Sequence, residues 1–442
     1  MENHLLFADE KGPQEHIKTQ VSEKSSRKLD DPMRRFAMGS DMMTNYVMAV
    51  VDIPEAQLGE VEDEFLRNEK KYRKASHNFQ GEIKGERLLK GKLFETGFTS
   101  MRDRELNFYL QTMQILKEHN AKVCIVTQNK VSSIITQRLH DWILISCKRM
   151  HVSFAIFTYI LAKYFTLEAG VGVLEKCQER EISTYQLLKA IKFDLLNYLR
   201  SHSSSPRLVS QINSYKQILK VISKSLNINT QDSADNVGHF EWEKVDFSLE
   251  LWLDERDGLR QDNSYHLFLD QGIKASSFNS NRFEKIQDGC HSDRMVGIRL
   301  ADLIATITGR LMSELSLASL YDPSEPEKTI RLEEKWFSLT NGQFKLARSL
   351  TDLIINTGLH FSFNNDTYFD DAVHLQAYLA FISDFKSPDS LKLSKEKPER
   401  EFEIYAELAA AKFNQMRAMP NQIRTLFDGE QDAIDQGFLK PF

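Results

Sequence analysis

Apolar positions in the first third of the chain predict three β-strands separated by helices. Residues 5–8 are apolar without alternation, which is typical of a short strand that is buried on both faces. Residues 46–53 and 121–127 form two further short apolar runs that predict strands. Helical spacing of apolar residues is found over residues 56–74, and the segment 106–118 also has a helical pattern. Strands that alternate with helices favour an α/β or α+β core.

The middle of the chain has a different pattern. Residues 131–201 are mostly helical in character, and a further helix is expected over residues 209–226. A helical block of this length between strands indicates an inserted lobe rather than a simple crossover connection. Residues 245–253 alternate apolar and polar side chains over their first half, which predicts another strand. The segment 296–311 is apolar almost all round and therefore predicts a buried helix.

These elements predict an α/β protein in which a mixed sheet is flanked by helices. Two separated parts of the chain are expected to form the sheet, with a large helical insertion between them and a helical region after them. The expected divisions are residues 1–130 and 241–320 for the two parts of the core, 131–240 for the insertion, and 321–442 for the C-terminal region.

Composition places the chain among ordinary globular proteins, because apolar residues make up 41% of it and charged residues 27%. The net charge of −6 argues against strong nonspecific binding of polyanions, so contacts with nucleic acid would depend on local basic patches. The four cysteines are far apart, which argues against a zinc knuckle or a disulfide framework and favours a cytoplasmic protein. The most apolar later stretch, residues 152–161, is too short to span a membrane.

Acidic residues at three places share a context that suits metal chemistry. Asp9 follows the first predicted strand, and Asp302 lies inside the predicted buried helix. Asp254, Glu255 and Asp257 follow the strand predicted over residues 245–253, and the sequence leaves open which of them faces the site. A buried carboxylate is costly unless a cation or hydrogen bonds compensate its charge.

Carboxylates are the ligands that hold Mg²⁺ or Mn²⁺ in enzymes of phosphoryl transfer, where the ions activate a water and stabilise the leaving oxygen. The order of strand carboxylate, strand carboxylate and late-helix carboxylate suits a ribonuclease H-like site. Alternation along a strand turns Asp9 and Glu10 to opposite faces, so we expect Asp9 to be the ligand and Glu10 to support it.

Two of these positions, Asp9 and Asp302, also have an explanation without a metal. Asp9 could cap a turn through its own backbone, as many aspartates in loops do. Arg299 lies one helical turn before Asp302 and could pair with it.

Short motifs resemble a known bacterial family, the domain of unknown function 3800. Residues 7–12, Phe-Ala-Asp-Glu-Lys-Gly, resemble the Asp-Glu-Ser-Gly start of that family. Residues 299–305, Arg-Leu-Ala-Asp-Leu-Ile-Ala, resemble its late helix with the sequence Gln-Leu-Ala-Asp-Leu. Residues 81–85, Gly-Glu-Ile-Lys-Gly, resemble its Glu-x-Lys element, and Ser292-Asp293 fit the polar turn before the helix. The resemblance covers residues 1 to about 312.

The resemblance implies a ribonuclease H-like fold and a metal-dependent nuclease, in a setting such as defence against phage or mobile elements. It implies that Lys84 holds the scissile phosphate or orients the attacking water, and that Glu82 is a candidate further ligand. Two positions depart from the family pattern, because Lys11 replaces a serine and Arg299 replaces a glutamine. Arg299 could neutralise Asp302, or it could contact a phosphate through its guanidinium group.

Two hypotheses follow from the sequence. The first is a nuclease that cleaves DNA or RNA with Mg²⁺ or Mn²⁺, with Asp9, Asp254 and Asp302 as metal ligands and Lys84 as a catalytic residue. The second is a ribonuclease H-like scaffold that is not catalytic and acts through a protein partner or as a homo-oligomer, using its helical regions. Stabilisation by a divalent cation would distinguish the two.

Overall fold

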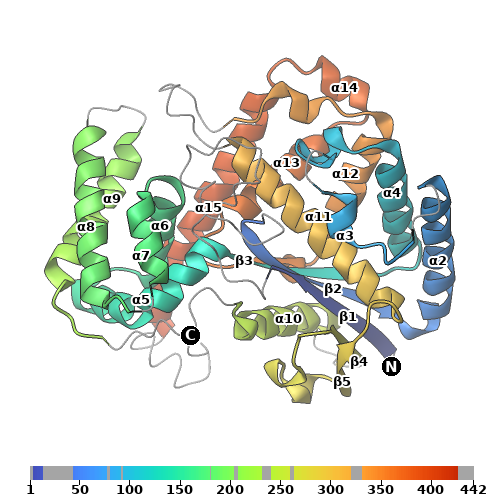
Figure 1. Cartoon of the computed structure of the whole chain (residues 1–442), viewed down its shortest axis with the longest axis horizontal. Coiled ribbons are helices and arrows are strands. Elements are labelled where there is room, and N and C mark those ends of the chain that lie inside the picture. The colour runs from blue at the N-terminus through green and yellow to red at the C-terminus, as the bar shows by residue number, and fades with distance from the viewer. Residues whose placement is uncertain are drawn as a thin grey trace. The chain divides into compact units, whose positions relative to one another are not determined.

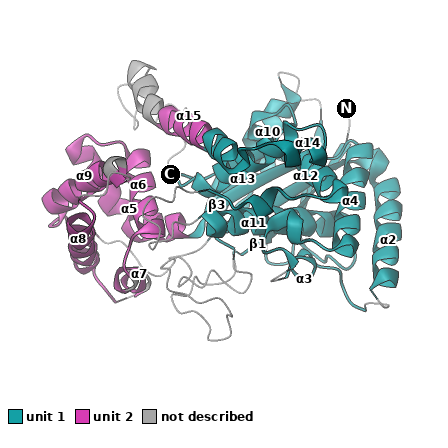
Figure 2. Ribbon diagram, turned by 90° about the horizontal axis from the view of Figure 1, so that it is seen from above, with its two compact units in different colours: residues 1–16, 38–130, 239–405 teal, residues 17–37, 131–238, 406–442 magenta. Residues whose placement is uncertain are grey.

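The computed structural model of the 442-residue chain describes residues 3–12, 43–76, 80–90, 93–179, 181–203, 208–230, 240–258, 263–319 and 331–426. The chain divides into two compact units (Figure 2). Unit 1 comprises Met1–His16, Met38–Lys130 and His239–Tyr405, and unit 2 comprises Ile17–Ala37, Val131–Gly238 and Ala406–Phe442. The residues that carry candidate chemistry all belong to unit 1.

A mixed sheet of six strands forms the centre of unit 1, in the order β5-β4-β1-β2-β3-β6 (Figure 1). β1 pairs antiparallel with β2, and β2 pairs antiparallel with β3. The pairs β1–β4, β4–β5 and β3–β6 are parallel. The strands are β1 (Asn3–Lys11), β2 (Asn45–Pro54), β3 (Lys122–Asn129), β4 (Ser264–Asp270), β5 (Lys285–Cys290) and β6 (Phe363–Asn365).

Side chains of β1 alternate between two hydrophobic cores, one on each face of the sheet. Leu5 and Phe7 belong to the core that α11 (Val296–Ser319) covers. Leu6 and Ala8 belong to the core that α10 (Trp242–Asp257) covers. The two helices therefore lie on opposite faces of the sheet, as Figure 1 shows. The central strand β1 is buried on both sides, which explains why its sequence is apolar without alternation.

Further helices complete the two units. Those of unit 1 are α2 (Leu58–Ala75), α3 (Gly85–Leu88), α4 (Asp103–Glu118), α12 (Asn341–Ile354), α13 (Asp370–Ser383) and α14 (Pro388–Leu393). Those of unit 2 are α6 (Phe154–Leu167), α7 (Val171–Gln178), α8 (Thr184–Ser201) and α9 (Val209–Ser225). Two helices continue from one unit into the other, α5 (Lys130–Met150) and α15 (Lys397–Leu426). Across the described ranges, no helix has the length and apolar character needed to cross a membrane.

The prediction of an α/β protein with a mixed sheet flanked by helices is confirmed. The strands expected over residues 5–8, 46–53 and 121–127 are β1, β2 and β3. The buried helix expected over residues 296–311 is α11, and the helical character expected over 131–201 is also present.

The strand predicted over residues 245–253 is wrong, because this segment lies within the helix α10. Its buried residues are Val245, Leu249, Trp252 and Leu253, whose spacing of four, three and one is helical. The sequence prediction also missed β4, β5 and β6, the last of which lies within the region 321–442 that was expected to be helical. Of these, β4 has the strict alternation of buried and half-buried residues that is typical of a strand with two different faces.

Candidate active site at the carboxyl ends of β1 and β4

Two aspartates lie side by side where the neighbouring parallel strands β1 and β4 end. Ala8 on β1 is paired with Leu269 on β4, so the next residues along the two strands are Asp9 and Asp270. Because the strands are parallel, both carboxylates lie at the same edge of the sheet. Alternation after Phe7 turns Asp9 to the face that α11 covers.

Asp302 reaches the same place from α11, the helix that packs on β1. Its Oδ1 forms an ion pair with the ammonium group of Lys11, the last residue of β1. Its Oδ2 accepts a hydrogen bond of 2.7 Å from the backbone N–H of Gly85. Both carboxylate oxygens of Asp302 are therefore engaged, one by a side-chain cation and one by a backbone donor.

Gly85 can donate this hydrogen bond because its backbone lies directly against α11. A Cβ atom at this position would be only 2.6 Å from the side chain of Thr306, one turn after Asp302. Lys84 precedes Gly85, and its positive charge counteracts the burial that raises the pKa of Asp270. The Lys84 side chain is half exposed and pairs with Glu82 at 3.3 Å. The segment of residues 81–85 therefore brings a lysine beside the carboxylates.

The electrostatics of the site show an excess of negative charge. Asp9 is only 4% exposed, and it has no hydrogen bond or ion pair in the part of the chain that the structure describes. Burial, and the charges of Asp302, Asp270 and Glu10, raise the pKa of Asp9 well above its usual range, although Lys11 opposes this effect. Burial lowers the pKa of Lys11, but the surrounding carboxylates outweigh it and leave the pKa above its ordinary value.

Glu10 lies on the other face of β1 from Asp9, as the sequence predicts. The side chains of Leu6 and Ala8 belong to the core on the α10 side, and alternation places Glu10 with them. Glu10 is 8% exposed, and its charge contributes to the raised pKa values of Asp9 and Lys11. Its effect on the site is therefore electrostatic.

The residues of the site fit a cation in chemical kind, because the carboxylates of Asp9 and Asp302 act on the ammonium group of Lys11, and Lys11 acts on Asp270. Over the described ranges, however, no three His, Cys, Asp or Glu side chains are arranged as a ready set of metal ligands. Lys11 is the cation that contacts Asp302 in this arrangement. Asp9, Asp270 and Asp302 are the residues that would hold a metal ion.

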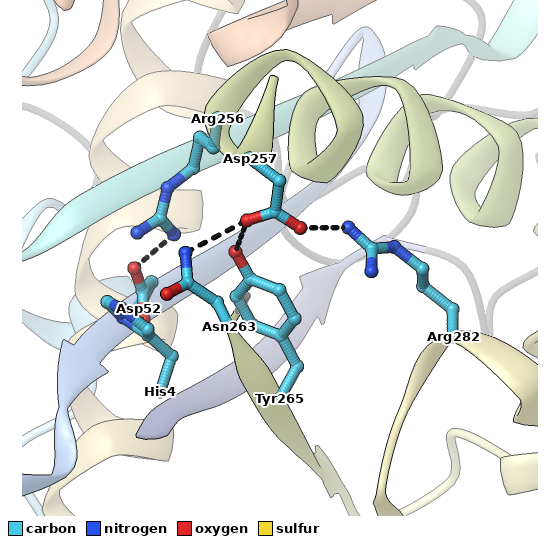
Figure 3. A network of polar contacts seen from close by, with 7 residues as sticks. All are labelled: His4, Asp52, Arg256, Asp257, Asn263, Tyr265 and Arg282. Carbon is cyan, nitrogen blue, oxygen red and sulfur yellow. Dashed lines mark hydrogen bonds and ion pairs between the residues drawn. The ribbon is translucent and has the colours of Figure 1, made fainter. Parts of the chain in front are cut away.

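Asp254 and Asp257, which the sequence predicts as ligands, lie elsewhere. Both are on α10, which covers the opposite face of the sheet. Asp257 accepts hydrogen bonds from the Tyr265 hydroxyl at 2.6 Å and from the Asn263 amide at 2.9 Å, and Arg282 lies 2.5 Å away (Figure 3). Tyr265 is near the start of β4, whereas Asp270 is at its end. The prediction that either residue joins Asp9 is wrong, because the strand on which it depended is a helix.

The network around Asp257 has a structural role. Burial acts to raise the pKa of Asp257, but the hydrogen bonds from Tyr265, Arg282 and Asn263 outweigh it, so the pKa is below its usual range. Asp254 is largely exposed and lies 3.7 Å from Arg282. These contacts connect the end of α10 to the sheet on the side away from the carboxylate site.

Arg299 does not pair with Asp302. The alternative in which Arg299 compensates the charge of the buried Asp302 is therefore wrong. Its guanidinium group instead contacts Glu69 of α2 at 2.7 Å and lies over the ring of Phe65. Burial raises the pKa of Glu69, and Arg299 opposes that effect. Arg299 therefore connects α11 to α2, and it leaves Asp302 to Lys11.

The sequence prediction did not include Asp270 in the site. It also did not place the ammonium group of Lys11 against Asp302. A signal for Asp270 is present, because the alternating run of β4 ends in Asp270-Gln271-Gly272. This ending resembles that of β1, where Asp9 is followed after two residues by Gly12. Lys11 was visible only as a departure from a family pattern.

Comparison of the chain with protein-family models, curated proteins and solved structures finds no match. The resemblance to the domain of unknown function 3800 stays an expectation that depends on the short motifs quoted above. Function is therefore inferred from the geometry of the carboxylate site itself.

Proposed function

We propose that the protein hydrolyses phosphodiester bonds in DNA or RNA, with a Mg²⁺ or Mn²⁺ ion held by Asp9, Asp270 and Asp302. The observation that carries this proposal is the Asp9 carboxylate, which is buried beside two others and has no hydrogen bond or ion pair among the described residues. Burial of such a charge costs several kcal/mol, and either a proton, as the raised pKa of Asp9 indicates, or a cation offsets that cost. A divalent cation supplies that compensation.

The order of the three carboxylates along the chain supports a ribonuclease H-like site, with one substitution in the expected set. Asp270 takes the role that the sequence assigned to Asp254, because it ends the strand that pairs with β1. The sequence of strand carboxylate, strand carboxylate and late-helix carboxylate is otherwise as expected. A mixed sheet flanked by helices is compatible with that fold class.

The residues around the carboxylates fit the needs of phosphodiester cleavage. A bound divalent ion would supply an activated water and would stabilise the leaving oxygen. Gly85 fixes the orientation of Asp302 through its N–H group. Lys84 is half exposed beside Asp270, where its ammonium group can bind a phosphate oxygen of the substrate. The exposed side of Lys84 gives this group access to a polyanion despite the net charge of −6.

Thermal unfolding with and without Mn²⁺ tests the proposal. The wild type should be stabilised by about 2.7 kcal/mol when the ion concentration is about one hundred times its Kd. Asp9→Asn, Asp270→Asn and Asp302→Asn should each lose most of this gain and should not cleave single- or double-stranded DNA or RNA. Asp257→Asn removes an equivalent charge on the other face of the sheet and should keep the gain. Equal responses of Asp270→Asn and Asp257→Asn to Mn²⁺ would contradict the assignment.

A scaffold without catalysis is the second candidate, and the ion pair between Lys11 and Asp302 favours it. In this case the ammonium group of Lys11 permanently takes the role of a metal ion. Neither Mg²⁺ nor Mn²⁺ would then stabilise the protein, no nucleic acid would be cleaved, and function would depend on contacts with a partner or a second copy of the chain. Sedimentation analysis of the purified protein would report such self-association.

A further inference from the structure

We infer that Lys11 is an internal cation that competes with the metal ion for Asp302 and thereby sets the metal concentration at which the site is filled. This inference rests on the proposed function, because it concerns the regulation of the same site. The first observation that supports this inference is the contact between the ammonium group of Lys11 and Oδ1 of Asp302. The second observation is the buried Asp9 carboxylate, which this lysine influences but does not pair with.

Among the described residues, Lys11 and Gly85 contact Asp302, and of these only Lys11 can be exchanged for another cation. The N–H donor of Gly85 belongs to a backbone that is packed against Thr306 with no room for even a Cβ atom. When a metal ion approaches Asp302, Oδ2 is already hydrogen-bonded to the fixed N–H of Gly85, and Oδ1 is in contact with the ammonium group of Lys11. Competition is confined to Oδ1.

The position of Lys11 allows it to leave. It is the last residue of β1, and 23% of its side chain is exposed, so the side chain borders solvent. The next residue, Gly12, has a φ of +90°, a conformation that glycine adopts without strain, and so the strand ends at this point. The flexible four-carbon stem of a lysine can move its charge without movement of the backbone.

Charge favours the exchange once a divalent ion is available. Lys11 brings one positive charge to a site that holds the carboxyl groups of Asp9, Asp270 and Asp302. A divalent ion brings two positive charges, and Mg²⁺ and Mn²⁺ prefer oxygen ligands such as carboxylates. Lys11 thus lowers the affinity of the site for metal without abolishing it, and it prevents the carboxylates from repelling one another when no metal is bound.

The test measures Mn²⁺ affinity by calorimetry, and free Mn²⁺ by electron paramagnetic resonance, in the wild type and in Lys11→Met. Loss of the Lys11 charge should tighten Mn²⁺ binding at least about tenfold, because the ion no longer displaces a bound cation. Lys84→Met is the matched control, since it removes the same charge from a half-exposed residue that does not contact Asp302. It should change the affinity less than about threefold. Lys11→Arg keeps the charge and should not tighten binding.

Each outcome decides between the two proposals. If Lys11→Met binds Mn²⁺ no more tightly than the wild type, the competition is refuted and the metal site stands. If neither protein binds Mn²⁺, the proposed function fails, and the competition fails with it. If Lys11→Met does not fold, as circular dichroism in metal-free buffer would show, the same comparison is made with Lys11→Gln, whose amide can still donate to Asp302.

Discussion

Substitution of Gly297 tests the close packing of α11 on β1 that brings Asp302 to Asp9. A Cβ atom at Gly297 would lie 2.2 Å from Cγ of Phe7, whereas ordinary contact begins at 3.4 Å. The shortfall is about 1.2 Å. The ring of Phe7 cannot retreat easily, because it is buried and stacks on Phe268 with centroids 5.1 Å apart. In Gly297→Ala, α11 must therefore move away from the sheet.

We expect Gly297→Ala to lower the free energy of unfolding by about 1–3 kcal/mol, the usual cost of overpacking a core. Chemical denaturation followed by circular dichroism measures this quantity. A shift of about 1 Å in α11 also moves Asp302 relative to Asp9 and should weaken Mn²⁺ binding. Phe7→Ala removes the Cγ and Cδ atoms that the methyl group would meet, so in a double-mutant cycle the two changes should couple favourably by at least about 1 kcal/mol.

Gly59→Ala is the matched control, since nothing lies within 4 Å of the Cβ position in this turn of α2. It should leave stability unchanged or raise it by about 0.5–1 kcal/mol, because alanine is the better helix former. Equal stabilities of Gly297→Ala and the wild type, with no coupling to Phe7→Ala, would refute the packing of α11 on β1 described above.

Two further predictions concern charges outside the site. Asp257→Asn should destabilise the protein by about 2 kcal/mol at pH 7, because it removes charge-assisted hydrogen bonds. Since the pKa of Asp257 is lowered in the folded state, its contribution is complete above the unfolded pKa of about 3.9 and is lost as the pH falls through the folded pKa. Urea denaturation at pH 7 and at decreasing pH below about 3.9 should show the stability difference between the variant and the wild type shrink, and a constant difference would contradict the pKa assignment. Arg299→Met should destabilise by about 3–5 kcal/mol, because it leaves Glu69 buried without its cation, and Glu69→Met in the same chain should restore most of the loss. Mn²⁺ affinity should stay unchanged in both Arg299 variants, and a tightened affinity would show that Arg299 acts on Asp302 after all.

Local patterns in the sequence predicted the strands and helices whose periodicity was unambiguous, such as β1 and α11. The prediction failed at α10, where alternate apolar residues at 245, 247 and 249 are typical of a strand. In the structure Phe247 is 44% exposed, while Trp252 and Leu253 are buried. The apolar side chain of Phe247 thus belongs to the solvent side of a helix and produces a period of two by chance.

Contacts between distant residues explain the rest of what the sequence could not predict. Asp9 and Asp302 were recognisable because each is a carboxylate within an apolar segment. Their surroundings were not, because Lys11 and Gly85 reach Asp302 from other elements of the fold. The pairing of Arg299 with Asp302 was inferred from helical spacing alone, whereas a guanidinium group of this length can reach a neighbouring helix and does so at Glu69.

The pairing of β1 with β4 has a consequence for how the protein folds. β1 forms its antiparallel pair with β2 from nearby sequence, but its parallel partner β4 begins at Ser264, after the whole of the 131–238 segment of unit 2. Closing so long a loop is entropically costly and slow compared with forming the β1–β2–β3 meander. We expect pulsed hydrogen exchange to find amides of β2 and β3 protected before those of β4. Asp9 and Asp270 then come together only in the last stage of folding. In a folding intermediate that contains only the β1–β2–β3 meander, the carboxylate of Asp9 is therefore not repelled by that of Asp270.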